Sequence, residues 1–161
     1  MPERLIDIPI ESLPFVDEHS LSVDAPAEAI WPALLETIGH GRADTPPGRL
    51  VVRALECEPR KRGGDPGRIG STIPGFIVAR AVPPGVLALM GRHRFSRYAL
   101  VFRITERDDA PTLVSAETRA EFPGRAGRGY RMLVIGSRGH VLATRSILRA
   151  IRRRAERAPK T

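Results

Sequence analysis

The chain has 161 residues, 42% of them hydrophobic, which suits one domain with one sizeable core. The absence of an apolar run of about 18 residues excludes a membrane span, and the start, MPERLIDIPIESLP, lacks the basic-then-apolar order of a secretory signal, so a cytoplasmic protein is expected. The net charge of +8 is uneven, because residues 1–48 hold nine acidic and two basic side chains, whereas residues 123–161 hold eleven basic and one acidic.

The segment 15–38, FVDEHSLSVDAPAEAIWPALLETI, passes from a strand pattern to a helix pattern. Strand side chains alternate between faces, so Phe15, Asp17, His19, Leu21 and Val23 are predicted to share one face of a strand. That face is mostly apolar, with His19 as a polar side chain among core residues.

A helix is predicted directly after this strand. Asp24 is the expected N-cap, and Pro26 falls in the first turn, where its missing N–H costs nothing. Ile30, Leu34 and Ile38 then recur at four-residue spacing, which predicts an amphipathic helix that packs on the sheet. Pro32 predicts a bend or a late start.

Beyond residue 40 the sequence predicts strands separated by turns. Residues 41–48 form a Pro/Gly linker, and the expected strands are 49–57, 71–82, 86–93, 96–106 and 112–122. Pro74 and Gly75 interrupt the second of these and favour an edge position or a bulge. The only cysteine, Cys57, excludes an internal disulfide and a cysteine-rich zinc site, and a buried reduced thiol is expected.

The C-terminal segment changes to a helical period. From Tyr130 to Ala155, apolar residues recur at three-, four- or seven-residue intervals, which predicts an amphipathic helix of roughly 25 to 30 residues. Gly136 and Gly139 each cost about 1 kcal/mol relative to alanine in a helix interior. The helix is therefore expected to bend there or to approach the sheet closely.

The predicted order is strand, helix, five strands and a long helix, and the tight turns favour an antiparallel α+β arrangement. The segment HSLSVDAPAEAIWPAL resembles the opening signature of the START/polyketide-cyclase (SRPBCC) superfamily, and GYRMLVIGSRGHVLATRSILRAIRRRAE resembles its closing one. The resemblance implies a helix-grip fold, in which a curved antiparallel sheet of six or seven strands wraps around the C-terminal helix. It covers a single domain at 14–157, between an N-terminal extension (1–13) and a short basic tail (158–161).

The resemblance also implies a pocket between sheet and helix for a lipid, sterol, polyketide or other hydrophobic molecule. Ordinary core packing explains the same residues equally well, because cavity lining and core look identical in a sequence. The candidates for this pocket are Leu21, Phe76, Met90, Tyr98, Leu100, Phe102, Thr118, Tyr130 and Val134.

Four polar side chains are candidates for contact with a ligand. His19 shares a strand face with apolar residues, although a hydrogen-bonded structural histidine is the commoner case. Arg80, Arg92 and His93 lie on or beside strands that would curve around the pocket, where an inward arginine would bind a carboxylate or polarise a carbonyl. A solvated position at the rim is the alternative for these residues.

Three functions remain compatible with the sequence. The first, which we favour, is binding of a hydrophobic small molecule, and the second is a cyclase- or dehydratase-like enzyme that uses the same pocket. The third is contact of the basic segment 149–160 with nucleic acid or an anionic membrane, but self-pairing with the acidic N-terminal third competes with it. No metal site or cofactor is expected, since the four histidines are scattered and no cofactor motif is present.

Overall fold

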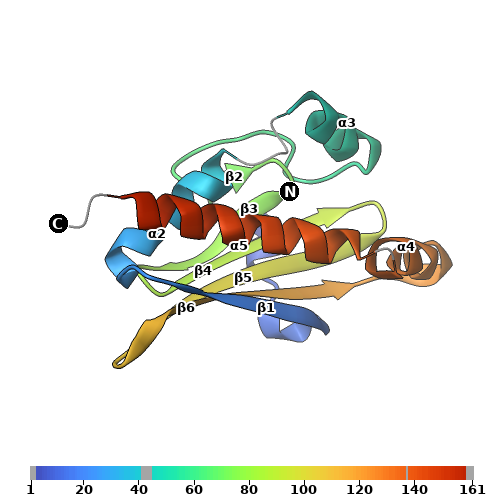
Figure 1. The fold of residues 1–161 in the computed structure, drawn as a ribbon. Helices are drawn as coiled ribbons and strands as arrows, with labels where there is room; N and C mark the ends of the chain where they lie inside the picture. The colour runs from blue at the N-terminus through green and yellow to red at the C-terminus, as the bar shows by residue number, and fades with distance from the viewer. Residues whose placement is uncertain (1–2, 41–44, 137, 159–161) are drawn as a thin grey trace.

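The computed structural model describes residues 3–40, 45–136 and 138–158, and a six-stranded antiparallel sheet forms its centre (Figure 1). The strand order is β1-β6-β5-β4-β3-β2, so β1 and β2 are the two edges. The strands are β1 (Phe15–Val23), β2 (Thr72–Ile73), β3 (Phe76–Val82), β4 (Val86–His93), β5 (Ser96–Arg107) and β6 (Ala110–Glu121). Tight turns join consecutive strands from β2 to β6, which forces the antiparallel pairing predicted from the sequence.

Two helices cover one face of the sheet, here called the inner face. The long α5 (Gly139–Arg157) runs across the strands, and α2 (Ala27–Gly39) packs beside it (Figure 1). The other helical segments are α1 (Glu3–Ile6), the 3-10 turn η1 (Ile10–Ser12), α3 (Pro46–Ala54) and α4 (Gly124–Gly136). The α+β helix-grip architecture expected from the sequence is confirmed.

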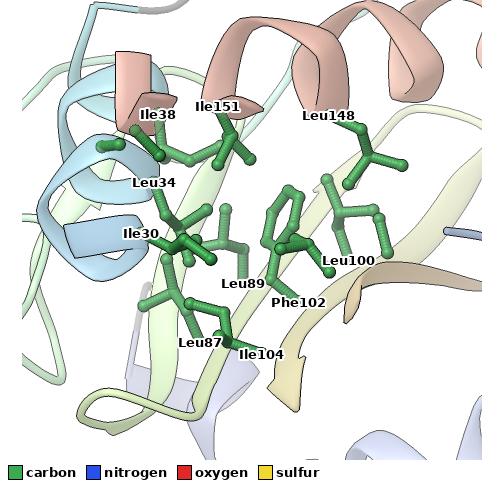
Figure 2. Packing of buried hydrophobic residues seen from close by; sticks show 14 of the residues in the cluster. Ile30, Leu34, Ile38, Leu87, Leu89, Leu100, Phe102, Ile104, Leu148 and Ile151 are labelled. Carbon is green, nitrogen blue, oxygen red and sulfur yellow. The ribbon is translucent and has the colours of Figure 1, made fainter. Parts of the chain in front are cut away.

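The main core lies between the inner face and these two helices. Phe102 is completely buried at its centre, and the close view in Figure 2 shows side chains from the sheet, α2 and α5 meeting around it. The labelled members are Ile30, Leu34 and Ile38 from α2, Leu87, Leu89, Leu100 and Ile104 from the sheet, and Leu148 and Ile151 from α5. The four-residue spacing read on α2 therefore marks its buried stripe.

A second, smaller core covers the opposite, outer face. Leu5, Ile10 and Leu13 of the N-terminal extension pack there against Ile77, Ala88, Met90, Ala99 and Val101. These strand residues alternate with those of the main core, as the period of two requires. The extension thus shields strands that are apolar on both faces.

The segment predicted as a strand at 49–57 is instead helical up to Ala54, and that prediction is wrong. Helix α3 begins after Thr45, whose side-chain oxygen accepts a hydrogen bond from the N–H of Gly48 at 3.3 Å, and a proline opens its first turn. Leu50 and Val51 are exposed by 67% and 54%, so these side chains have no packing against a neighbouring strand that would stabilise an extended conformation. Residues 41–44 of the predicted linker lie outside the described residues.

Helix α2 begins at Ala27, and Asp24 is not its N-cap, contrary to prediction. The N–H of Ala27 donates to the Glu106 carboxylate on β5 at 2.9 Å, while the N–H of Asp24 donates to Glu156 on α5 at 3.2 Å. The helix continues through Pro32. A carboxylate distant in sequence therefore supplies the acceptor at the helix start.

The predicted single C-terminal helix is two helices, α4 and α5. Arg138 adopts a left-handed conformation, with φ of 57°, between Gly136 and Gly139. The interruption thus falls where the two glycines predict a bend, because a helix cannot continue through a left-handed residue. The side chain of Val134 and the tail residues 159–161 lie outside the described part of the chain.

Candidate functional site

A cavity of about 330 Å³ lies between the sheet, α2 and α5. Its floor is apolar and comes from four strands, through Ile73, Phe76, Leu89 and Leu100. The helices supply the remaining wall residues, among them Thr37, Ile38, Ala143, Ile147 and Ala150. His40, Ser146 and Arg154 also belong to the lining, so the helix-grip arrangement leaves a mostly apolar space with a few polar groups at the position that the resemblance implies.

Phe76 and Leu100 are the pocket candidates that line this cavity, and their role as ligand contacts stays a prediction. Phe102 and Leu21 belong to the adjoining main core, on the same face of the sheet. Met90 is fully buried on the outer face, where it packs with the N-terminal extension. The expectation for Met90 is therefore corrected, because strand alternation turns its side chain away from α5.

The two candidate arginines also point away from the cavity. Arg80 lies 3.5 Å from Glu11 of the N-terminal extension, after a bulge in β3 shifts the register. Arg92 donates to the Glu58 carboxylate at 2.7 Å. Both are partly exposed and paired with acids, so the structure favours the alternative in which these arginines are solvated.

His93, Tyr98 and Tyr130 form an aromatic cluster at one end of the sheet. The ring centroid of His93 lies 4.8 Å from that of Tyr130 and 5.4 Å from that of Tyr98. Phe95 stacks on Tyr130 at 5.3 Å, and Phe76 meets Tyr98 edge to face at 5.2 Å. Phe76 also lines the cavity, so the aromatic cluster contacts the cavity wall through this residue.

The polar atoms of this cluster are held by the backbone. The Tyr98 hydroxyl donates to the carbonyl oxygen of Gly75 at 2.8 Å, and its ring covers Gly91, where a side chain would overlap that carbonyl. Burial, followed by the neighbouring Cys57, raises the pKa of Tyr98 well above its usual value. Cys57 is a buried free thiol, as the sequence predicts, and burial raises its pKa as well.

His93 is set in one protonation state by its surroundings. Its Nδ1 accepts a hydrogen bond from the N–H of Phe95 at 3.1 Å, so Nδ1 carries no proton there. Burial lowers the pKa of His93 and favours the same neutral form. The side chain therefore serves as a packed, neutral imidazole.

A polar cluster stands on the inner face near the β1 edge. The Asp17 Oδ2 atom lies 2.7 Å from Nε2 of His140 on α5 and 3.2 Å from Nε2 of His19. His19 and Asp17 point to the inner face as predicted, since they pair across the strands with Ala116 and Thr118. Phe15 is instead 58% exposed, because a bulge between Phe15 and Asp17 changes the register.

Sequence reasoning missed Asp17 and His140 as members of this cluster. Asp17 shares a strand face with His19, which is a usable signal, but nothing in the sequence reveals that the first turn of α5 reaches β1. Thr118 is a predicted pocket residue, and it lies beside Asp17 on β6. The helix residues of the cavity wall were also missed, since helical spacing marks a buried stripe and not an empty space.

A larger hollow of about 650 Å³ lies elsewhere, where β1 passes into α2 and β5 turns into β6. Asp24, Asp109, Pro111 and Glu156 are among its lining residues, and it includes none of the predicted site residues. Its walls come from the end of β1, the starts of α2 and β6, the turns beside them and the end of α5. We place the candidate site in the smaller cavity, because that cavity lies between the sheet and the gripped helix.

Other classes of site find little support in the described residues. No helix among them is long and apolar enough to cross a membrane, and none of their groups of acidic, histidine or cysteine side chains could hold a metal ion. On α5, Arg154 lies 3.4 Å from Glu36 of α2. This contact is an instance of the self-pairing between basic and acidic segments that the sequence offers as an alternative to an external anionic partner.

Comparison with known proteins places the chain by its fold. No family model matches the sequence, and no curated protein is significantly similar to it. A truncated norcoclaurine synthase from Thalictrum flavum has a TM-score of 0.52 at 13% identity, over 85% of this chain and 94% of that chain. Protein CV1439 from Chromobacterium violaceum has a TM-score of 0.53 at 14% identity, over 89% of this chain and 99% of that chain.

A third solved structure, protein MLL2253 from Mesorhizobium loti, has a TM-score of 0.50 at 14% identity, over 89% of this chain and 98% of that chain. At such identities the likeness shows the fold. The chain shares the fold of these structures, and the helix-grip fold that the resemblance of its two end segments implies is confirmed.

Proposed function

We propose that this chain binds a small hydrophobic or amphipathic molecule in the cavity between the sheet and α5. The observation that carries the proposal is the apolar cavity of about 330 Å³, walled by strand residues such as Leu89 and helix residues such as Ile147. Ligand pockets occupy about 300 to 1,000 Å³ and are mostly apolar with a few polar groups. This cavity is at the lower end of that range, which suits a compact ligand.

The fold comparison is compatible with such a role. One solved structure of similar fold is norcoclaurine synthase in complex with dopamine and hydroxybenzaldehyde, at a TM-score of 0.52 and 15% identity. Those are small aromatic compounds bound by that protein. For the present chain, compounds of similar size are a reasonable starting set for a search.

The test uses 2-methylnaphthalene, a fluorescent apolar probe of suitable size. We expect saturable binding to the purified protein, and native mass spectrometry of fresh protein should detect a co-purified small molecule. Ala150→Phe places a ring in the cavity and should weaken probe binding at least 10-fold, whereas Ala126→Phe, at an exposed site on α4, should not. Absence of probe binding to the wild-type protein, together with absence of any co-purified molecule, would refute the proposal.

A second candidate function is acid–base catalysis of the cyclase or dehydratase type. The supporting observation is the Asp17 carboxylate within 3.2 Å of His19, since a carboxylate that orients an imidazole is a common arrangement of a general base. Any ligand found by the binding screen should be incubated with protein and followed by mass spectrometry. A product that forms with the wild type but not with His19→Gln supports catalysis, and no product supports binding alone.

A further inference from the structure

One row of side chains crosses the inner face from the cavity to the β1 edge. The strand register places Leu89, Leu100, Thr118 and Asp17 side by side on β4, β5, β6 and β1. The two leucines line the cavity. Because neighbouring strands lie about 4.8 Å apart, Thr118 is one strand spacing from Leu100, and Asp17 is two, or about 10 Å. The row is thus apolar at one end and polar at the other.

Two polar atoms in this row lack hydrogen-bond partners. Oδ1 of Asp17 and Oγ1 of Thr118 are completely buried, and neither has a partner within residues 3–40, 45–136 and 138–158. Buried polar atoms are nearly always satisfied, because leaving one unpaired costs about 1–3 kcal/mol. Two such atoms on directly paired residues, with Cβ atoms about 5 Å apart, are within reach of one small polar group.

The unpaired Asp17 oxygen is fixed in place by its neighbours. The bulge between Phe15 and Asp17 sets the strand register, and His140 and His19 both contact the other carboxylate oxygen, Oδ2. Oδ1 is therefore the carboxylate oxygen that has no partner among the described residues. The site is held by β1, β6 and α5 together.

The two atoms define the chemistry of the missing group. A carboxylate oxygen accepts hydrogen bonds, whereas the Thr118 hydroxyl either donates or accepts. A hydroxyl group donates to Asp17 and accepts from Thr118, but a carbonyl or ether oxygen has no proton to donate. An anion would be repelled by the carboxylate, and an ammonium ion would lose more hydration than a neutral group on entering this buried place.

On this basis, and resting on the proposed function, we infer that Thr118 and Asp17 form a subsite for the hydroxyl group of the ligand. The apolar part of such a ligand occupies the cavity beside Leu100. The ligand class is therefore a compact hydrophobic alcohol or phenol. Figure 2 shows Leu148 of α5 facing Leu100 within the main core.

The test compares four naphthalene probes that differ in one substituent. We expect 2-naphthol to bind the wild type about 10-fold more tightly than 2-methylnaphthalene, from one hydrogen bond to a charged acceptor. The ether 2-methoxynaphthalene cannot donate to Asp17 and should bind like 2-methylnaphthalene. Tighter binding of 2-(aminomethyl)naphthalene than of 2-naphthol would overturn the assignment of a hydroxyl group.

The variant Thr118→Val keeps the side-chain shape and removes the unpaired hydroxyl. It should reduce the preference for 2-naphthol, because the hydroxyl of the probe then keeps only its bond to Asp17, leave 2-methylnaphthalene binding unchanged, and keep or raise the Tm of the empty protein. Thr112→Val is the matched control: its hydroxyl already donates to the Ala25 carbonyl at 2.7 Å, so it should lower the Tm and keep the probe preference.

Two results would overturn the subsite alone while the cavity still binds 2-methylnaphthalene. The first is that the wild type shows no preference for 2-naphthol, or that Thr118→Val keeps the full wild-type preference. The second is a Tm of Thr118→Val as low as that of Thr112→Val, which would mean that a structural water already satisfies the hydroxyl. Failure of all four probes to bind would instead overturn the proposed function, and the subsite with it.

Discussion

The hydroxyl of Tyr98 donates a 2.8 Å hydrogen bond to the carbonyl oxygen of Gly75. Gly75 has a φ of 86° and lies in the turn between β2 and β3. The hydrogen bond therefore links β5, in the middle of the sheet, to a turn at the β2 edge of the sheet. Burial raises the pKa of Tyr98 well above its usual value, which keeps the hydroxyl protonated and able to donate. The cavity residues Ile73 and Phe76 flank this turn.

Removing the Tyr98 hydroxyl should destabilise the protein. Tyr98→Phe leaves the Gly75 carbonyl without this donor, and we expect the free energy of unfolding to fall by about 1–2 kcal/mol. Urea unfolding followed by circular dichroism measures this change. Tyr130→Phe is the control, since Tyr130 contributes ring contacts, which this substitution keeps. Equal losses in the two variants would contradict the importance of the Tyr98 hydrogen bond.

His93 should make stability depend on pH. Burial lowers the pKa of His93 in the folded state, whereas a histidine in the unfolded chain has a pKa of about 6.5. The unfolded chain therefore binds more protons than the folded protein in mildly acidic solution. The stability contributed by neutral His93 is therefore complete above that pH and is lost as the pH falls through the folded-state pKa. Unfolding free energies measured from pH 7.5 to 5 should decrease, and less steeply in His93→Gln. Identical slopes for the two proteins would count against this assignment.

Glu106 should stabilise the start of α2 from a distance. Its carboxylate accepts the 2.9 Å hydrogen bond from the N–H of Ala27 and places negative charge at the positive end of the helix. We expect Glu106→Ala to cost about 1 kcal/mol, as the loss of an N-cap does, and Glu106→Gln to cost less because an acceptor remains. Thermal unfolding of both variants measures this effect, and wild-type stability in Glu106→Ala would refute it.

The N-terminal extension should matter for stability because it covers the outer face of the sheet. Leu13 is 2% exposed in the outer core, so Leu13→Ala should lower the free energy of unfolding by about 2–4 kcal/mol. Leu50 on α3 is 67% exposed, and Leu50→Ala should change stability by less than about 0.5 kcal/mol. Chemical unfolding of the two leucine variants compares identical substitutions. A small effect at Leu13 would mean that residues 3–13 add little to the fold.

Much of the fold could be predicted because local patterns agree with the tertiary arrangement. The alternation in β5 and β6 and the four-residue spacing of Ile30, Leu34 and Ile38 each mark a face that the structure buries. The prediction at 49–57 failed because Val51 and Val52 have high strand propensity, while Thr45 and Pro46 supply a helix start that outweighs it. Propensity alone does not decide a segment that lacks neighbours to pack against.

The candidate site was harder to predict than the fold. The sequence identified Phe76, Leu100, His19 and Thr118 as inward residues, but Met90 was assigned to the wrong face because both faces of β4 are apolar. A strand buried on both sides carries no polar alternation to show which face meets the gripped helix.

The sequence by itself indicated β1, α2, the strands β4 to β6 and the inward parity of Asp17 and His19, because these follow from side-chain periodicity along one segment, and the resemblance of its two end segments implied the helix-grip architecture. Only the tertiary structure decided that His140 meets Asp17, that Glu106 caps α2, and that Asp17 Oδ1 and Thr118 Oγ1 are buried without partners in the described chain. These contacts join residues far apart in the sequence, and only the packing of α5 and the strand register fixes the distances between them.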